Sequence, residues 1–189
     1  VFINTELAEP WEEKVVERSE ADLRRLILPY MSGTVPESAV ALTAGIDVQA
    51  DHYYFVVRAW TNLLESWLVE AGRCEDWPTL EREVLHGQWD GHQLRLGCID
   101  SGYNTWEIYE RCLRFRGLLR PTKGSSRPLR RPYEATVVTM NRATNKPIPG
   151  GLQLWTLDTG RIKDRIIRLQ SVREEDRKST RLNSSHRIR

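Results

Sequence analysis

The sequence predicts a mixed α/β domain in which an antiparallel meander is followed by alternating helices and strands. Two patterns predict this class. Residues 40–71 hold three β-rich runs joined by short turns, whereas helical and extended patterns alternate from residue 77 to 172. A meander followed by such alternation is typical of one mixed sheet with helices packed on it.

The three expected strands of the meander are residues 40–48, 52–61 and 65–71. The first alternates between an aliphatic face and a face that carries Gly45 and Asp47. The second is rich in Tyr, Phe, Val and Trp, which are residue types that strands favour. Short turns between the runs indicate antiparallel neighbours.

The alternating part begins with an expected helix at 77–86, where Pro78 lies in the first turn, a position that suits proline. A second helix, at 105–115, places large apolar side chains on one stripe. The other expected elements are strands at 94–100, 118–121, 134–140 and 152–158, a turn-rich segment at 145–151, and a helix at 161–172 with Ile162, Ile166 and Leu169 inward.

The N-terminal part has another character. A charged helical pattern at 12–28 ends at Pro29, and the stretch 32–36 contains Ser, Gly and Pro in the manner of a linker. We therefore expect a domain boundary, with residues 1–35 before it and a domain at 36–175 after it.

Composition argues against a membrane, collagenous, disulfide-rich or wholly disordered protein. Of the 189 residues, 40% are hydrophobic, which is enough for a core, and 29% are charged. Residues 1–11 lack a basic start followed by an apolar run, so we expect no signal peptide, and the sequence has no run of the ~18–20 apolar residues that a membrane span needs. Cys74, Cys98 and Cys112 are an odd number without metal-ligand spacing, which favours a reducing compartment over a disulfide scaffold.

The C-terminal segment changes the charge balance. Residues 176–186 match the peptide that one frame of a common sequencing adapter encodes, so we expect 176–189 to be an artefact without ordered structure. The alternative is a basic, disordered tail for nucleic acid. Setting aside its five basic residues and one acidic residue lowers the net charge from +2 to −2. The start at Val1 likewise leads us to expect a gene cut at both ends.

Three acidic residues lie at or near the ends of strands in the predicted sheet: Asp47, Asp100 and Asp158. Converging carboxylates can hold Mg²⁺ or Mn²⁺ through their oxygens. Two such ions can activate water and stabilise the leaving oxygen when a phosphodiester is cut. These three aspartates are therefore the candidate catalytic and metal-binding residues.

Each aspartate has a plainer interpretation. An Asp at a strand end is often a turn former or a helix N-cap, and Asp100 before Ser-Gly and Asp158 before Thr-Gly both suit that role. Asp164 competes with Asp158 for the third ligand position. It lies on the solvated side of its helix, so Asp158 is preferred.

Leu-Thr-Ala-Gly-Ile-Asp-Val-Gln-Ala-Asp (42–51) and Cys-Ile-Asp-Ser-Gly-Tyr-Asn-Thr (98–105) are two motifs that each contain a candidate aspartate. They resemble the first two acidic motifs of the nuclease domain of phage terminase large subunits of the GpA (lambda-like) family. Leu157-Asp158-Thr159 with Lys163 is similar to the third, and Lys123-Gly124 to a Lys-Gly after the next strand. Residues 2–11 resemble the segment that closes the family's ATPase domain.

The resemblance implies an RNase H-like fold and an endonuclease that uses two Mg²⁺ or Mn²⁺ ions to cut concatemeric viral DNA during packaging. It implies that residues 1–35 are the end of an ATPase domain, although the chain contains no phosphate-binding Gly-x-x-x-x-Gly-Lys-Ser/Thr loop. The implied partners are double-stranded DNA, the small terminase subunit and the portal protein, with no membrane. The implied location is the cytoplasm of the bacterial host.

Residues 123–131 form an expected flexible basic loop, which we call the basic loop. Its cations, Lys123, Arg127, Arg130 and Arg131, suit contacts with DNA phosphates, and the alternative is a solvated loop. Trp77, Trp89 and Trp106 fit packing better than base stacking. His52, His86 and His92 lack ligand spacing and have no assigned role.

Two rival functions remain open from sequence. One is another RNase H-like nuclease or recombinase, such as a transposase or resolvase, which the upstream gene sequence would reveal. The other is a non-catalytic DNA-binding or assembly fragment whose aspartates only form turns. A joint response of the three aspartates to Mn²⁺ would separate that rival from the nuclease.

Overall fold

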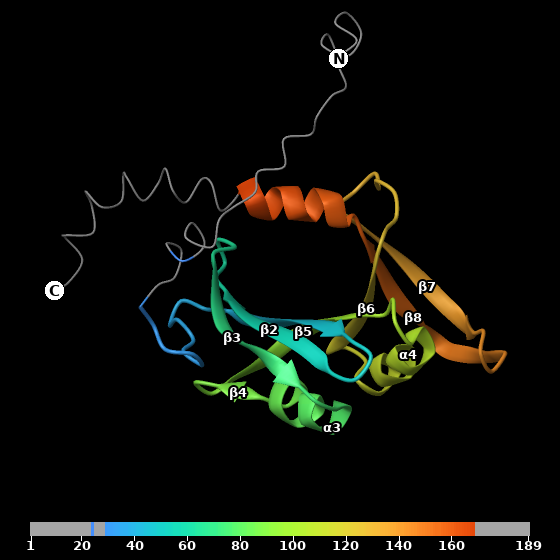
Figure 1. Ribbon diagram of the computed structural model, residues 1–189, viewed down its shortest axis with the longest axis horizontal. Coiled ribbons are helices and arrows are strands. Elements are labelled where there is room, and N and C mark those ends of the chain that lie inside the picture. The colour runs from blue at the N-terminus through green and yellow to red at the C-terminus, as the bar shows by residue number, and fades with distance from the viewer. Residues whose placement is uncertain (1–23, 25–28, 169–189) are drawn as a thin grey trace, which may run out of the picture. The chain divides into compact units, whose positions relative to one another are not determined.

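A single mixed sheet organises the part of the chain that the computed structural model describes, which is residue 24 and residues 29–168. Within it, Tyr30–Ile166 form one compact unit (Figure 1). The expected helix at 12–28 (apart from Arg24, which is helical), the segment 2–11 and the 176–189 tail lie outside the described residues.

The sheet follows the order β3-β2-β1-β5-β6-β8-β7, with β4 paired only to β5. Strands β1, β2 and β3 form the predicted antiparallel meander, and β5, β6 and β8 add to it in parallel. The strands are β1 (Ala41–Val48), β2 (Tyr53–Trp60), β3 (Ser66–Cys74), β4 (Gln88–Trp89), β5 (His92–Asp100), β6 (Leu119–Gly124), β7 (Tyr133–Asn141) and β8 (Lys146–Leu157). The fold is thus the expected mixed α/β sheet of the RNase H-like class.

The parallel pairing decides where the loops meet. Because β1, β5, β6 and β8 run in the same direction, their carboxyl ends share one edge of the sheet. All three candidate aspartates and the basic loop lie at the carboxyl ends of strands of this set. The topology therefore gathers the predicted functional residues along one edge.

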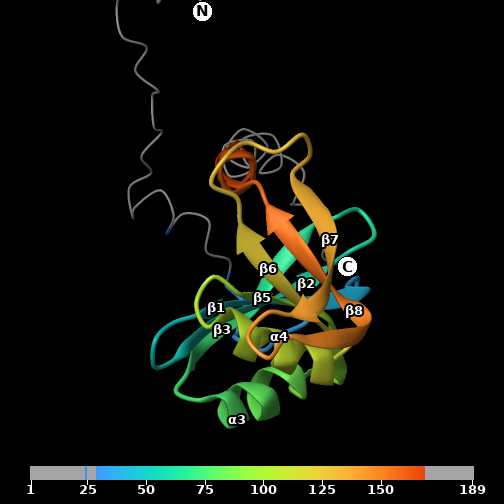
Figure 2. The ribbon, with the colours of Figure 1, turned by 90° about the vertical axis from the view of Figure 1, so that its right-hand side faces the viewer.

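Two helical segments cover one face of the sheet (Figures 1 and 2). The first joins α3 (Trp77–Leu80) to a π-helical turn, η1 (Glu81–Leu85), and Asp76 caps it by accepting a hydrogen bond from the Thr79 N–H at 2.8 Å. The second is α4 (Thr105–Arg114), between β5 and β6. Burial of aliphatic side chains between these helices and the sheet supplies the main stabilising free energy of the fold.

The predicted packing role of the tryptophans is confirmed for two of them and fits the third. Trp77 and Trp89 are buried in the core, whereas Trp106 is half-buried and lies edge-on against Tyr109. All three cysteines are free thiols, and Cys74 and Cys112 are buried. No described helix is both long enough and apolar enough for a membrane span.

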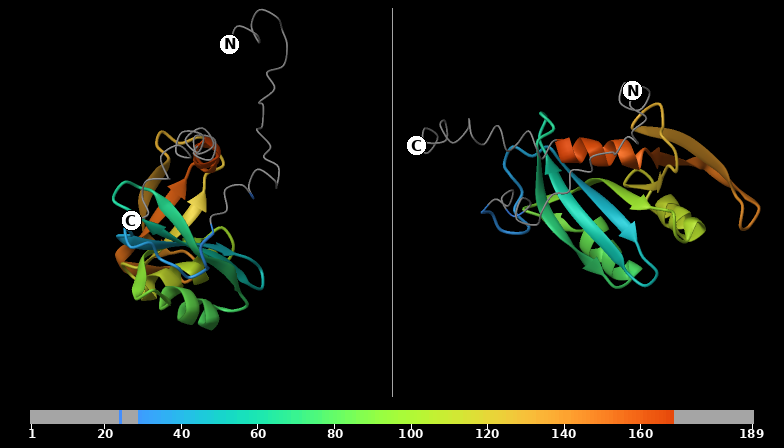
Figure 3. Two further views of the ribbon diagram at one scale, coloured as in Figure 1. Left: turned by 90° about the vertical axis from the view of Figure 1, so that its left-hand side faces the viewer. Right: turned by 45° about the horizontal axis from the view of Figure 1, so that its top comes forward.

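The β7–β8 hairpin extends beyond the rest of the sheet (Figures 1 and 3) and differs from the prediction. The segment 145–151, expected as a turn, is mostly strand, because β8 already begins at Lys146. Over residues 146–151, β8 pairs only with β7, and its other side has no neighbouring strand in the described part of the chain. Pro147 and Pro149, which have no N–H group, fit there because that side needs no hydrogen-bond donor. The chain turns instead at residues 142–145.

Two other boundaries differ from expectation. Lys123 and Gly124 belong to β6, so only the remainder of the basic loop is irregular. The helix after β8 begins at residue 159 and is described to 168, and Ile166 is 50% exposed rather than inward. Leu169 lies outside the described residues. Near the expected linker, the Gly33 N–H donates to the Val69 carbonyl at 2.8 Å, which ties this stretch to β3.

Candidate metal centre and nucleic-acid interface

Asp47, the second-last residue of β1, and Asp100, the last residue of β5, lie at the ends of neighbouring parallel strands, on the same face of the sheet. The register pairs Gly45 with Cys98 and Ile46 with Ile99, so the next step places Asp47 beside Asp100. Gly45 and Asp47 are exposed, and Cys98 and Asp100 are half-buried, whereas the isoleucines face the core. The two carboxylates therefore lie side by side on the face opposite α3 and α4.

A local irregularity in β5 creates this arrangement. Leu42 pairs with Leu94, but Thr43 pairs with Leu96, so one extra residue of β5 bulges between them. Leu94 faces the core, whereas Leu96 lies on the Asp100 face. Strict alternation along residues 94–100 would place Leu94 on the same face as Asp100, but the bulge reverses the alternation and puts Leu94 on the opposite face.

The residues after Asp100 bind the end of β5 to β6. Ser101 is fully buried, and its N–H and its hydroxyl both donate to the Thr122 carbonyl at 2.8 Å. The Thr122 hydroxyl donates to the Ile99 carbonyl at 3.0 Å, and the Thr105 hydroxyl donates to the Ser101 carbonyl at 2.7 Å. The backbone on both sides of Asp100 is therefore fixed, which preorganises its carboxylate.

Each of the two carboxylates has one oxygen in a local hydrogen bond. Asp47 Oδ2 accepts from Gln49 Nε2 at 2.7 Å, and Asp100 Oδ1 accepts from the Gly102 N–H at 3.2 Å. Among the described residues, the other oxygen of each accepts no hydrogen bond. A Cβ at Gly102 would lie 3.2 Å from Asp100 Oδ2, so the missing side chain keeps this oxygen accessible.

Such a pair of carboxylates suits a hard divalent cation. Mg²⁺ prefers oxygen ligands and is usually held by one or two carboxylates, with waters and substrate phosphates completing its shell. The exposed face leaves room for those further ligands. The donor set of Asp47 and Asp100 therefore fits Mg²⁺ or Mn²⁺.

Asp158 lies at the same edge of the sheet but does not join this pair. Through Thr122 of β6, the register places Trp155 of β8 level with Asp100. Asp158 follows three residues later, about 10 Å farther along the strand direction, and it is two strands, about 10 Å, across the sheet. Two-metal sites have ions only about 3.5–4 Å apart, so one such site does not span this separation.

Within residues 29–168, no three Asp, Glu, His or Cys side chains group closely enough to hold a metal ion. The described part thus brings together two of the three predicted ligands. The metal role of Asp158 stays a prediction that this geometry does not favour. Asp164, its rival from sequence, is exposed, as expected.

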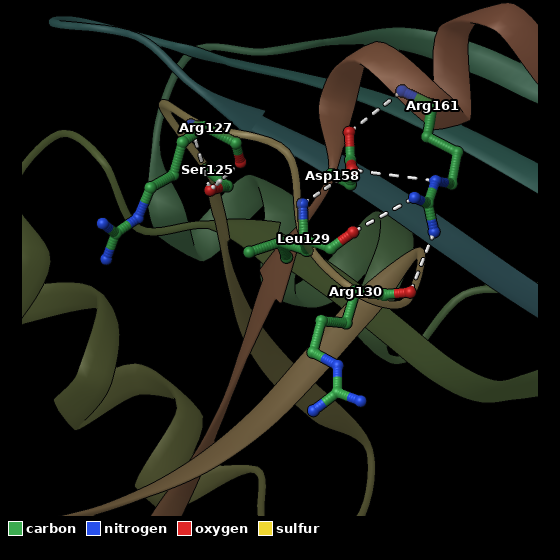
Figure 4. Close-up of polar contacts among 6 residues, drawn as sticks. All are labelled: Ser125, Arg127, Leu129, Arg130, Asp158 and Arg161. Carbon is green, nitrogen blue, oxygen red and sulfur yellow. Dashed lines mark hydrogen bonds and ion pairs between the residues drawn. The ribbon is translucent and has the colours of Figure 1, made fainter.

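Asp158 binds protein backbone instead, as Figure 4 shows. Its Oδ1 accepts from the Arg161 N–H at 3.0 Å, which caps the following helix, and its Oδ2 accepts from the Leu129 N–H at 2.9 Å. These backbone hydrogen bonds, from Arg161 first and Leu129 second, hold the pKa of Asp158 below its usual range. Asp158 is only 6% exposed, and its lowered pKa keeps the carboxylate ionised at neutral pH in this nearly buried position.

The basic loop carries the predicted cations at the surface. Lys123, at the end of β6, is exposed, as are the three loop arginines, Arg127, Arg130 and Arg131. None of them pairs with a carboxylate in the described part of the chain. Because they follow β6, they lie at the same sheet edge as Asp100. Exposed, unpaired cations at this edge suit contacts with phosphate groups.

Sequence reasoning missed three residues of this region. Gln49 orients Asp47, Gly102 leaves room at Asp100, and Arg161 contacts the basic loop. Gln49 and Gly102 each follow a candidate aspartate by two residues. At this spacing an Asp side chain often accepts a hydrogen bond from a neighbouring residue, so the sequence did contain a signal for these two. The role of Arg161 had no signal in the sequence, because its partners are about thirty residues away.

Comparison with known proteins agrees with these observations. The model of the family "Terminase large subunit gpA, endonuclease domain" matches residues 1–187. That range includes most of the 176–189 segment, whose adapter origin stays a prediction. No solved structure matches the chain.

Two curated relatives are similar to the chain. It is 34% identical to "Terminase, large subunit" of Escherichia phage lambda over 179 residues, which cover 87% of the chain and 26% of that protein. It is 30% identical to "Terminase, large subunit" of Enterobacteria phage P21 over 158 residues, 77% of the chain and 24% of that protein. The chain thus spans about a quarter of the length of these relatives. It belongs to the gpA family of terminase large subunits and corresponds to the endonuclease domain of that family.

Proposed function

We propose that this chain is a metal-dependent endonuclease domain that cuts concatemeric double-stranded viral DNA for packaging. The observation that carries the proposal is the pairing of Asp47 with Asp100, in register and on an open face. Membership of a terminase endonuclease family supplies the reaction class. It also favours this function over the transposase or resolvase considered from sequence.

Asp47 and Asp100 are the residues that would hold two Mg²⁺ or Mn²⁺ ions. Bound at such a site, these ions lower the pKa of water and neutralise charge on the scissile phosphate. The protein contributes two carboxylates whose orientation is set before DNA arrives, by Gln49 for Asp47 and by the fixed end of β5 for Asp100. Asp158 remains the third ligand predicted from sequence, and its contacts with backbone argue for a different role.

DNA would reach the site along the edge that carries the basic loop. Lys123 and the loop arginines would neutralise phosphates, which gives affinity without sequence preference. In the full-length protein we expect an ATPase domain, with the small terminase subunit and the portal protein as partners. The place of action would be the cytoplasm of the bacterial host.

The test is cleavage of linear double-stranded DNA by the 189-residue chain with Mn²⁺, Mg²⁺ or EDTA. We expect cutting with either metal and none with EDTA. Asp47→Asn keeps the size of the side chain and the oxygen that accepts from Gln49, but it removes the charge. This variant should lose the activity entirely.

Asp51→Asn is the matched control, because Asp51 follows the same strand, is exposed and pairs with His52 at 2.6 Å. It should cut DNA as the wild type does. Undiminished cutting by Asp47→Asn would reject the assignment of Asp47. A wild-type chain that binds DNA but never cuts it would favour the non-catalytic rival.

A further inference from the structure

The basic loop is held by Asp158 and Arg161, which contact only its backbone. Besides the bond from the Leu129 N–H to Asp158, the Arg161 guanidinium donates to the Leu129 carbonyl at 3.1 Å and to the Arg130 carbonyl at 3.2 Å. The Asp158 N–H donates to the Pro132 carbonyl at 2.9 Å. The backbone of Leu129 and Arg130, and of Pro132 directly after the loop, is therefore attached to Asp158 and Arg161 at the start of the helix after β8.

The two clamping side chains also support each other. Arg161 Nε lies 3.8 Å from Asp158 Oδ2, and the Arg161 N–H is capped by Asp158 Oδ1. At the other end of the loop, Ser125 and Arg127 exchange hydrogen bonds between the Ser125 hydroxyl and the Arg127 backbone, at 2.6 and 3.3 Å. The loop thus has defined backbone contacts at both of its ends.

This network leaves the loop's own cations unused. The guanidinium groups of Arg127 and Arg130 point away from Asp158 (Figure 4). Both are exposed, as is Arg131, and in residues 29–168 none of the three makes an ion pair. A rigid backbone that presents free guanidinium groups is a preorganised binding surface for phosphates, because less conformational entropy is lost on binding.

We propose that Asp158 and Arg161 form a latch that fixes the basic loop in the conformation that binds the DNA backbone. The proposal rests on the proposed function, in that it takes DNA as the ligand of this edge. It makes Asp158 and Arg161 positioning residues, since they act through the loop. It also accounts for an ionised, nearly buried aspartate that lies away from Asp47 and Asp100.

For the removal of the Asp158 charge, the latch predicts weaker DNA binding, whereas electrostatics alone predicts stronger binding. Removing a negative charge beside a DNA site should strengthen DNA binding. Asp158→Ser removes that charge and keeps a side-chain oxygen for the helix cap, but a serine is too short to hold the Leu129 N–H as well. If the latch is real, this variant should bind DNA more weakly, by about 5- to 30-fold, the effect of losing one or two hydrogen bonds.

Asp164→Ser is the matched control, because Asp164 is exposed on the same helix and makes no hydrogen bond or ion pair with the basic loop. It removes the same charge and should bind DNA as well as the wild type, or slightly better. Binding of a short duplex is measured by fluorescence anisotropy with EDTA present, so that cleavage and metal ligation play no part. In cleavage assays with Mn²⁺, Asp158→Ser should raise KM for DNA, because its loop binds the duplex more weakly.

Arg161→Ala tests the other half of the latch. It removes both guanidinium hydrogen bonds to the loop, whereas Arg165→Ala removes an equal charge from the same helix at a residue that has no hydrogen bond or ion pair with the loop. Arg161→Ala should weaken DNA binding by several times more than Arg165→Ala. Hydrogen exchange gives a readout without DNA: the Leu129 amide should be protected in the wild type and should exchange faster in Asp158→Ser.

Several outcomes would overturn the latch. One is unchanged or tighter DNA binding by Asp158→Ser, and another is a Leu129 amide that exchanges equally fast in both proteins. Loss of Mn²⁺ binding in Asp158→Ser, to the extent seen in Asp47→Asn, would make Asp158 a metal ligand instead. A wild type that bound DNA but did not cut it would contradict the proposed function and leave the latch intact.

Discussion

Replacing Asp47 with Asn is expected to stabilise the metal-free protein while abolishing its stabilisation by Mn²⁺. Asp47 and Asp100 stand side by side at the ends of adjacent strands, and in residues 29–168 neither makes an ion pair. Two like charges in this position repel each other unless a cation lies between them. The Asn amide oxygen still accepts from Gln49, so the variant loses charge but no hydrogen bond.

The spacing of the strands gives the magnitude. Adjacent strands lie about 4.8 Å apart, and two unit charges about 5 Å apart in a water-like dielectric repel by about 0.8 kcal/mol. For a folded unit of this size, about 1 kcal/mol corresponds to about 3 °C in Tm, so the variant should melt about 2 °C higher in EDTA. One Mn²⁺ at a hundredfold excess over its Kd stabilises the wild type by about 2.7 kcal/mol, which is about 8 °C.

The assay is thermal unfolding of the 189-residue chain, followed by circular dichroism in EDTA and in MnCl₂. The wild type should gain about 8 °C from saturating Mn²⁺. Asp47→Asn should gain nothing, and Asp51→Asn should respond as the wild type does. A variant that is less stable than the wild type in EDTA, or one that keeps the full Mn²⁺ shift, would refute the reasoning.

Three other predictions concern the basic loop and two buried groups. Replacing the three loop arginines with Ala should reduce the slope of log K for DNA against log[salt] by about 2.7, measured by anisotropy from 50 to 200 mM salt. Because the Arg161 and Leu129 N–H groups hold the pKa of Asp158 low, its stabilising contribution is present above about pH 3.9 and is lost as the pH falls through its folded pKa. In acid-unfolding measurements, the free energy of unfolding should therefore fall more below pH 3.9 for the wild type than for Asp158→Ser. Burial raises the pKa of Cys112 to about 12, so the free energy of unfolding should fall between about pH 8.5 and 12 by up to about 1.4 kcal/mol per pH unit, a component that Cys112→Ala lacks in urea titrations.

The meander and the alternating elements could be predicted because local patterns encode them. Strand β1 has strict alternation, and the helix that begins at Trp77 has an Asp cap and a proline in its first turn. The hairpin was harder. Pro147 and Pro149 indicate a turn in a sequence, yet they fit a strand whose second edge is unpaired, and that edge depends on distant pairing with β6.

The residues of the candidate site could be predicted from the sequence, but their positions relative to one another could not. The position of Asp100 beside Asp47 depends on the bulge between Leu94 and Leu96, which alternation alone does not reveal. The position of Asp158 depends on how far β8 is shifted along β6, a register that only the folded sheet defines. Its second interpretation from sequence, a helix cap, is confirmed by the bond from the Arg161 N–H.

Crystals of the wild-type chain grown with Mn²⁺ would test the central claim most directly, through the anomalous signal of the metal. We predict Mn²⁺ between the side chains of Asp47 and Asp100, as two peaks about 3.5–4 Å apart when a DNA phosphate is bound. Asp158 should keep its bond to the Leu129 N–H in the same crystals. Mn²⁺ bound elsewhere, with Asp47 and Asp100 free of metal at saturating concentration, would contradict the account.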